Sequence, residues 1–362
     1  MKFYEQNMGL QLGNVENDGV KWESTARLNV GLDANLFENR LALSVDWYKS
    51  RTSDLLIQKQ YPFVTGMGTY WANGGEMDNM GVEATLNAKL VNARNFQWEL
   101  GASVGHYKNE IVSLDEEAAP VSVYGAEIAT MVGQPAGVFW GYKTDGVISS
   151  SAQAEGLYQL DATNTPEYFK AGDMKFVDVN PGNNPGCIDE KDKTVIGNPN
   201  PDIYGNIFTR LSTHGVSLDV NFNYSLGNDV YNYYRRQLES GSTFYNQTVA
   251  MANRWTVEGQ ETDMPAVAYG DPRGNSRFSD RWIEDGSYLR LKTIKLSYDI
   301  PLSVNWLQGI TVWAAAENVY TLTKYTGMDP EFSVNNHILY QGVDAGLLPQ
   351  SRSFHLGVKV NL

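Results

Sequence analysis

The fold class is decided by residues 26–47, which read ARLNVGLDANLFENRLALSVDW. Apolar residues occupy every second position from Ala26 to Leu36 and again from Leu41 to Trp47. An α-helix would mix the two alternating sets around its axis, whereas a β-strand puts them on opposite faces. The four residues between the two runs suit a tight turn. The stretch therefore predicts a long β-hairpin with one apolar face and one polar face.

The same period of two recurs in further runs at residues 82–90, 96–104, 216–224 and 354–362. Strands of globular proteins average about 5–6 residues, whereas a strand that crosses a membrane needs roughly 9–11. The runs here are of the longer kind, and tight turns alternate with long irregular segments, notably 113–200 and 238–281. Long strands with short turns at one end and long loops at the other are typical of an outer-membrane β-barrel.

Smaller features refine this prediction. The apolar positions shift from odd to even numbers between residues 289 and 298, which predicts a β-bulge in that strand. The last residues, HLGVKVNL, resemble the C-terminal assembly signal of outer-membrane barrels, with Leu362 at the end. Aromatic residues near the run ends are expected at the membrane interfaces: Trp22, Trp47, Phe96, Trp98, Trp313 and Tyr320.

Alternating strands also occur in soluble β-sandwiches and jelly rolls. The pattern therefore leaves open a second hypothesis from another class of protein, a secreted soluble β-domain that binds or hydrolyses glycans. A substitution such as Val30→Arg should cost roughly 2–4 kcal/mol if that position meets the middle of a bilayer. A sandwich core would also suffer from it, so fractionation with and without detergent separates the two hypotheses better.

Composition excludes several classes of function. The chain has 362 residues with 28 Lys and Arg against 42 Asp and Glu, a net charge of −14. This charge disfavours general binding to a phosphate backbone, so we expect no nucleic-acid partner. One cysteine, Cys187, excludes an internal disulfide framework and a four-cysteine zinc site. Residues 1–12 show no signal-peptide pattern, and no run of 18 apolar residues predicts a transmembrane helix.

Several short stretches recur together in one known family. They are KWE at 21–23, GVFWGY at 137–142, IGNPNP at 196–201, NYSLGNDVYN at 223–232, DGSYLRLK at 285–292, ENVY at 317–320 and TGMDPE at 326–331. In this order they resemble the SusC/RagA-type TonB-linked outer-membrane proteins. The resemblance covers nearly the whole chain, from Lys21 to Leu362. Each stretch is short, and only their combination is specific for the family.

The resemblance implies an all-β fold, an antiparallel transmembrane β-barrel of the outer membrane of a Gram-negative bacterium. Residues 1–362 would be its C-terminal part, a partial barrel of about ten strands with long extracellular loops. The plug domain, the N-terminal half of the barrel and the segment that contacts TonB would be absent, so the chain is expected to be a fragment that cannot transport alone. Complete family members import oligosaccharides or peptides together with a SusD-like lipoprotein lid.

The resemblance also gives the two faces of the sheet their roles. One face would meet outer-membrane lipid. Polar residues on the other face would line the plug or the path of the solute, among them Arg27, Asn29, Asp33 and Asn35.

One acidic loop has the residue types of a calcium site. Calcium prefers several oxygen ligands on a tightly turning backbone. The candidate ligands are Asp178, Asn180, Asp189 and Asp192. Members of the family often carry an Asp-rich loop just before the Ile-Gly-Asn-Pro stretch, and this copy departs from it by the inserted turn at 181–185. The alternative is an acidic loop that is simply solvated.

The predicted loops are rich in aromatic residues, whose faces suit sugar rings, peptide side chains and protein interfaces. The residues proposed to contact a ligand or the lid are Trp140, Tyr142, Tyr233, Tyr234 and Tyr245. The alternative is that the loops use these rings to pack on themselves.

No residue is proposed as catalytic, and we do not expect an enzyme. Residues 101–105, GASVG, match the G-x-S-x-G nucleophile elbow, but that motif requires a strand-to-helix turn and this one lies inside an alternating run. The neighbouring carboxylates at 115–117 and 189–190 give no facing pair of the kind that glycosidases use. The four histidines show no metal-ligand spacing, and no histidine neighbours Cys187.

Overall fold

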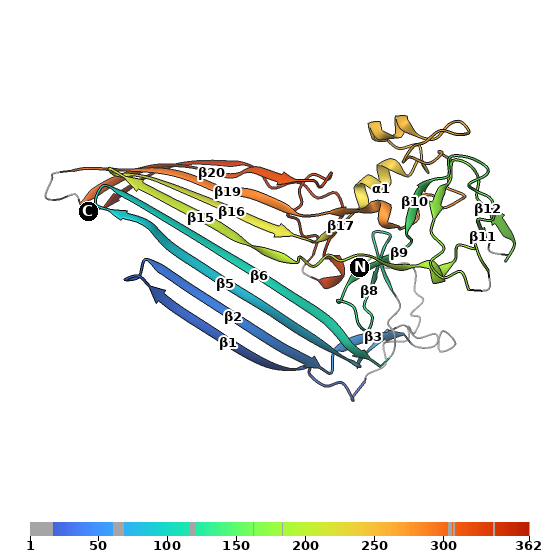
Figure 1. The fold of residues 1–362 in the computed structure, drawn as a ribbon, viewed down its shortest axis with the longest axis horizontal. Coiled ribbons are helices and arrows are strands. Elements are labelled where there is room, and N and C mark those ends of the chain that lie inside the picture. The colour runs from blue at the N-terminus through green and yellow to red at the C-terminus, as the bar shows by residue number, and fades with distance from the viewer. Residues whose placement is uncertain are drawn as a thin grey trace, which may run out of the picture.

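The structure is a computed structural model that describes residues 17–60, 69–115, 120–161, 163–182, 184–302, 306, 308–335 and 337–361. The predictions made on residues 1–12, 116–117 and Leu362 lie outside these ranges. The molecule has two parts, a broad twisted sheet and a loop assembly at one end of it (Figure 1). No helix in the described ranges is long and apolar enough to cross a membrane.

The main sheet has nine antiparallel strands in the order β1-β2-β5-β6-β15-β16-β19-β20-β22. Their bounds are β1 Ser24–Leu36, β2 Leu41–Ser53, β5 Gly75–Ala93, β6 Phe96–Leu114, β15 Ile203–Thr213, β16 Val216–Leu226, β19 Tyr288–Ile300, β20 Gly309–Thr323 and β22 Ser353–Asn361. The prediction of long, alternating antiparallel strands is confirmed. The count in the described sheet is nine, against the expected ten or so.

The connections differ in length at the two ends of the sheet. Those at residues 37–40, 94–95 and 214–215 are tight turns, and β19 ends and β20 begins at the same end (Figure 1). His214 and Gly215 both have positive φ, which is the backbone that a two-residue hairpin turn requires. The opposite end carries the long connections 54–74, 115–202, 227–287 and 324–352. This is the predicted arrangement of a barrel wall.

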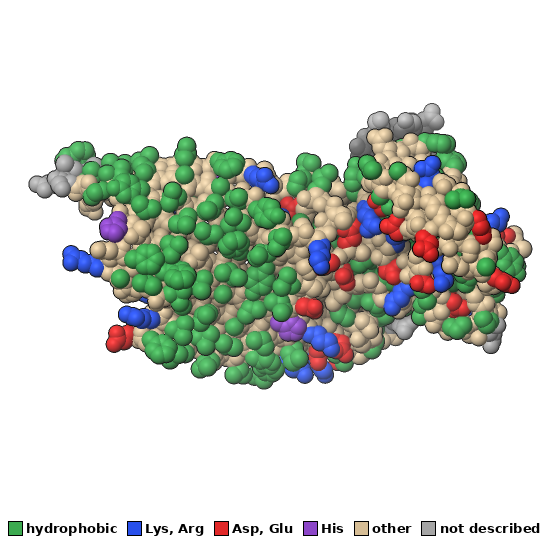
Figure 2. Space-filling model, turned by 45° about the horizontal axis from the view of Figure 1, so that its top comes forward, with side chains coloured by type: hydrophobic (Ala, Val, Ile, Leu, Met, Phe, Trp, Pro, Cys, Tyr) green, Lys and Arg blue, Asp and Glu red, His purple; other side chains and the backbone are tan. Residues whose placement is uncertain are grey.

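The two faces of the sheet differ as the alternation predicts. Leu28, Val30 and Leu32 on β1 are 60%, 58% and 62% exposed, and the apolar face continues across the sheet to Phe354 and Leu356 on β22. Figure 2 shows apolar side chains covering this face in a broad band. Among the described residues no second sheet packs against it. A soluble sandwich would bury this surface, so the fold is the barrel wall and not the sandwich.

The phase shift in the sequence is a β-bulge in β19. Asn221 of β16 pairs with Thr293 and Phe222 pairs with Leu291, so Lys292 is the extra residue. The same shift appears against β20, where Leu291 pairs with Tyr320 and the next paired residue is Thr293. The predicted bulge is therefore confirmed, and it leaves apolar residues on the same face on both sides of it.

The expected aromatic rims are only partly formed. Trp98 points outward near the tight turns, whereas Trp47 and Tyr320 point outward nearer the loops. Trp313 is an exception, because it pairs with Gly357 and Ser297 on the polar face. Its assignment to the membrane interface is wrong, since the alternation of β20 places it one residue out of phase with the outward-facing Val312.

The long connections fold into one packed loop assembly of small sheets. The four-stranded sheet is β14-β9-β8-β7, a three-stranded sheet is β18-β17-β21, and β3-β4, β10-β13 and β11-β12 are two-stranded. The bounds of these strands are β3 Leu56–Gln60, β4 Thr69–Asn73, β7 Val121–Val123, β8 Ala126–Ala129, β9 Val138–Gly141, β10 Thr144–Val147, β11 Tyr158–Leu160, β12 Pro166–Tyr168, β13 Met174–Phe176, β14 Thr194–Gly197, β17 Asp229–Asn232, β18 Ile283–Asp285 and β21 Val343–Asp344. The short helices are α1 Tyr233–Glu239, η2 Glu190–Asp192, η3 Val249–Asn253, η4 Asp280–Trp282 and η5 Ile338–Tyr340.

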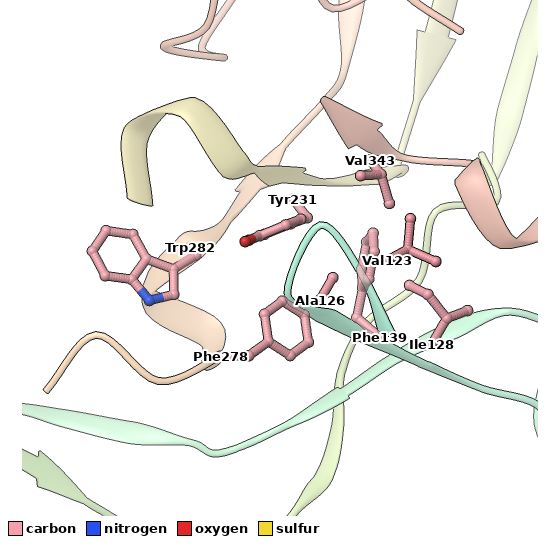
Figure 3. Packing of buried hydrophobic residues seen from close by; sticks show 8 residues of the cluster. All are labelled: Val123, Ala126, Ile128, Phe139, Tyr231, Phe278, Trp282 and Val343. Carbon is pink, nitrogen blue, oxygen red and sulfur yellow. The ribbon is translucent and has the colours of Figure 1, made fainter. Parts of the chain in front are cut away.

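A buried apolar cluster joins three of the four long connections (Figure 3). Its members are Val123, Ala126, Ile128, Phe139, Tyr231, Phe278, Trp282 and Val343. The rings of Tyr231 and Phe278 meet edge to face with centroids 5.0 Å apart. Burial of such side chains contributes about 1.5–3 kcal/mol each, so the cluster holds together loops that are far apart in sequence.

Candidate functional site: the polar face and the loop assembly

The inner face of the sheet is polar along its length. Arg27, Asn29, Asp33 and Asn35 lie on this face, as predicted, because each alternates with an outward-facing apolar residue of β1. Ser44 Oγ donates a 2.6 Å hydrogen bond to Asp33 Oδ1, and the guanidinium of Arg27 lies 4.5 Å from the centroid of the Tyr48 ring. The face therefore offers charges, amides and hydroxyls to whatever lies inside the curve of the wall.

Glycines on this face make room for aromatic rings of the next strand. A Cβ on Gly101 would lie 1.9 Å from Cε1 of Phe208, and one on Gly105 would lie 2.6 Å from Cζ of Tyr204. Ser103, between these two glycines, donates a 2.8 Å hydrogen bond to Asn206 Oδ1. The G-x-S-x-G match at 101–105 is thus a packing feature inside β6, with no strand-to-helix turn to present a nucleophile.

An ion-pair cluster fixes the last long connection to the barrel wall. The bulge lets both Arg290 and Lys292 reach the segment after β20, where Arg290 pairs with Asp329. Arg290 Nη1 lies 3.0 Å and Lys292 Nζ lies 3.1 Å from carboxylate oxygens of Glu331. The Arg290 side chain is only 2% exposed. Separating such a buried pair leaves an uncompensated charge, so the loop base is held firmly to β19.

A second cluster ties α1 to β18 of its own connection and, through Glu284, to the connection 324–352. Arg235 Nε lies 3.0 Å from Glu239 Oε2, and Arg235 Nη1 lies 3.1 Å from Glu284 Oε1. The backbone N–H of Thr326 donates to Glu284 Oε2 at 2.9 Å. Helix α1 begins at the N-cap Asn232, whose side chain accepts a hydrogen bond from the backbone N–H of Arg235. The polar contacts therefore reinforce the apolar cluster in making one rigid loop assembly.

The five predicted contact aromatics occupy different environments. Tyr142 is buried, donates a 3.3 Å hydrogen bond to Glu190 Oε1 and packs edge to face on Phe176. Burial raises the pKa of the Tyr142 hydroxyl. Trp140 and Tyr233 are half-buried within the assembly, whereas Tyr234 and Tyr245 are exposed. The contact role stays a prediction for all five, and only the last two have rings open to a partner in this structure.

The structure adds an exposed aromatic pair that the sequence pattern does not single out. The rings of Phe244 and Tyr269 stack with centroids 5.0 Å apart and an interplanar angle of 22°, and the two residues are 91% and 73% exposed. A surface hollow of about 500 Å³ adjoins Tyr269, lined also by Arg236, Asp271 and Arg277. The two rings are 25 residues apart in an irregular segment, so no periodicity could have paired them.

The acidic loop uses its carboxylates to hold its own backbone. The buried Asp192 accepts hydrogen bonds from the backbone N–H groups of Val179, Asn180 and Asp189 at 2.9, 3.0 and 2.8 Å. Asp178 accepts one from Gly186 at 2.7 Å, while its Oδ1 is buried without a partner. In the described ranges no three His, Cys, Asp or Glu side chains are grouped to hold a metal ion. Calcium binding by this loop stays a prediction.

The comparisons with known proteins agree with this geometry. A TonB-dependent receptor of Formosa agariphila, P3, is 31% identical over 371 residues, which is 98% of this chain. SusC of Bacteroides thetaiotaomicron is 26% identical over 352 residues, or 95% of the chain. The solved RagAB peptide importer in its closed-closed state is 25% identical, superposes with a TM-score of 0.76 and covers 99% of the chain. Over nearly its whole length the chain is similar to TonB-dependent receptors of the SusC/RagA type.

The chain spans about a third of the length of the curated relatives it matches, 36% of P3 and 32% of SusC. It likewise covers 37% of the aligned RagAB chain. No protein-family model matches the sequence. The relatives are named as receptors and importers rather than as enzymes.

Proposed function

We propose that this chain supplies part of the barrel wall and the extracellular loops of a nutrient importer in the outer membrane of a Gram-negative bacterium. The single observation that carries the proposal is the nine-stranded sheet, with one exposed apolar face and one polar face, in a chain similar to TonB-dependent receptors of the SusC/RagA type. The chain performs no covalent step. Its polar face would line the plug or the solute path, and the loop assembly would meet the solute first.

The substrates proposed are oligosaccharides or peptides, and the proposed partner is a SusD-like lipoprotein that covers the loops. TonB would act through a plug and an N-terminal part that the complete receptor contributes. The rigidity of the loop assembly supports the docking of such a partner, because a preformed surface loses little conformational entropy when another protein binds to it. Tyr234 and Tyr245 are exposed on that assembly and are the proposed contacts. The role in the outer membrane rests on the family of the relatives.

The test is uptake in the bacterium that makes the protein. Deletion of the gene should abolish growth on, and accumulation of, a labelled oligosaccharide or peptide, and the complete gene should restore both. The double variant Tyr234→Ala/Tyr245→Ala should lower uptake and recovery of the lipoprotein partner, whereas Tyr168→Ala, an exposed loop tyrosine outside the set, should not. Undiminished uptake of both substrate classes in the deletion strain would refute the proposal.

We also propose calcium binding at the acidic loop by Asp178, Asn180, Asp189 and Asp192, and the buried, unpartnered Oδ1 of Asp178 supports it. Calcium titrated into the protein should give a saturable change in Trp fluorescence or in heat. Asp178→Asn should remove that signal, and Asp145→Asn in strand β10 should keep it. The absence of a saturable signal at millimolar calcium would refute calcium binding by this loop.

A further inference from the structure

A basic group interrupts the outward face of the sheet at the end nearest the loops. Lys49 of β2, Met80 of β5 and Lys108 of β6 pair in one row across three neighbouring strands. Directly paired residues of antiparallel strands point to the same face, and this row follows the outward Trp47 and Val82 by two residues. Figure 2 shows basic and acidic side chains gathered where the apolar band ends toward the loops.

The two lysines retain hydrogen-bonding capacity. Their side chains are 51% and 63% exposed. Arg51 takes both carboxylate oxygens of Asp78 at 2.6 and 2.8 Å, which leaves Lys49 Nζ 3.8 Å from the same group. Lys108 Nζ donates to one oxygen of Glu110 at 2.8 Å. An ammonium has three donors, so each lysine can bind another acceptor.

The position of the row matches the level of a lipid headgroup. Arg40 and Lys49 bound the apolar run of β2, which extends about 30 Å along the strand. A tilt of roughly 40° reduces this to a height close to the ~25 Å of an outer-membrane hydrocarbon band. The ammonium groups therefore lie just beyond the acyl chains. The carboxylates of Asp78 and Glu110 lie one row farther out, on the side of the lysine row away from the apolar band.

The basic row is local to three strands and is not a general rim. At the loop ends of β16, β19 and β20 the outward residues are Leu226, Leu289 and Leu322. Neighbouring strands lie about 4.8 Å apart, so the two lysines start about 10 Å apart on either side of the exposed Met80. A phosphate can sit between them while hydrocarbon chains lie on the apolar face below.

We propose that Lys49 and Lys108 form a binding site for the phosphate of an anionic membrane lipid in the leaflet on the loop side. The acyl chains of this lipid lie along Trp47 and Val82. The site rests on the proposed membrane location and adds to it a preference for one class of lipid. Because it faces away from the polar face, it is separate from the proposed solute path.

The test uses the complete protein in nanodiscs, with bound lipid counted by native mass spectrometry. Phosphorylated glycolipid (lipid A) and phosphatidylglycerol should bind more tightly than zwitterionic phosphatidylcholine. Lys49→Gln/Lys108→Gln should weaken binding of the anionic lipids about 30-fold, as expected from the attraction of each lysine to an anionic surface. The matched control, Lys175→Gln/Lys191→Gln in the loop assembly, should bind as the wild type does.

Three outcomes would overturn the site: equal retention of phosphatidylcholine, wild-type lipid binding by the double variant, or displacement of the lipid by millimolar inorganic phosphate. The proposed function is tested separately by uptake and by fractionation. The double variant should still enter the membrane fraction and transport. A protein recovered folded without detergent would instead refute the membrane role itself.

Discussion

Leu32→Arg tests most directly whether lipid covers the apolar face. Leu32 is 62% exposed on the outward face of β1 and pairs with Val45, near the middle of the apolar run that Arg40 and Lys49 bound on β2. Val30, at 58% exposure, pairs with Trp47 and so lies closer to the loop-side boundary. The structure thus places the middle of the bilayer nearer Leu32 than Val30.

The expected loss of stability in Leu32→Arg follows from the depth of Leu32 in the bilayer. An arginine on the lipid face of a barrel costs about 2–4 kcal/mol at the midplane and about 0–1 kcal/mol near the interface. Leu32→Arg should therefore reduce the ratio of folded to unfolded protein about 30-fold to 700-fold. Val30→Arg should cost less. Asn29→Arg, on the polar face of the same strand, carries no lipid penalty and is the matched control.

The assay is denaturant-induced unfolding of the complete protein in lipid vesicles, together with the assembled fraction in the membranes of cells. The expected order of stability is wild type, then Asn29→Arg, Val30→Arg and Leu32→Arg. An equal loss for Asn29→Arg and Leu32→Arg would show that the arginine acts through something other than lipid. If Leu32→Arg left the stability unchanged, lipid would not cover that face.

Gly101→Ala should cost about 1–3 kcal/mol in the same unfolding assay, because the new Cβ would overlap the ring of Phe208. Ser103→Ala should cost only ~1 kcal/mol and leave uptake intact, and loss of uptake in this variant would reopen a catalytic role. Arg290→Met should speed proteolysis of residues 324–352, because it leaves the carboxylate of Asp329 buried without its partner at a cost of about 3–5 kcal/mol. Adding Asp329→Leu should restore protection from the protease. The hydrogen bond from the backbone N–H of Thr165 lowers the pKa of Asp161. The ionised Asp161 should therefore stabilise the β11–β12 hairpin above pH ~4, and this stabilisation should be lost as the pH falls further. If proteolysis of Asp161→Asn depended on pH as strongly as that of the wild type, this prediction would be contradicted.

Much of the fold was predictable because a strand records its environment at every second residue. The run from Ala26 to Leu36 separates its two faces without any tertiary information, and the phase change between residues 289 and 298 predicts the bulge that strand pairing places at Lys292. The site was less predictable. Tyr142 and Tyr245 look alike in the sequence, yet one is buried and the other exposed, because irregular loops have no period from which burial can be read.

The sequence by itself therefore determined most of the long strands and their two faces, the alternation of short and long connections and the resemblance to one family. These are properties of consecutive residues, since sheet geometry repeats every two residues. Tertiary structure alone decided that Phe244 stacks on Tyr269, that Arg290 meets Asp329, and that Lys49 and Lys108 flank Met80. Such contacts join residues far apart in the chain, and strand register and loop packing bring them together.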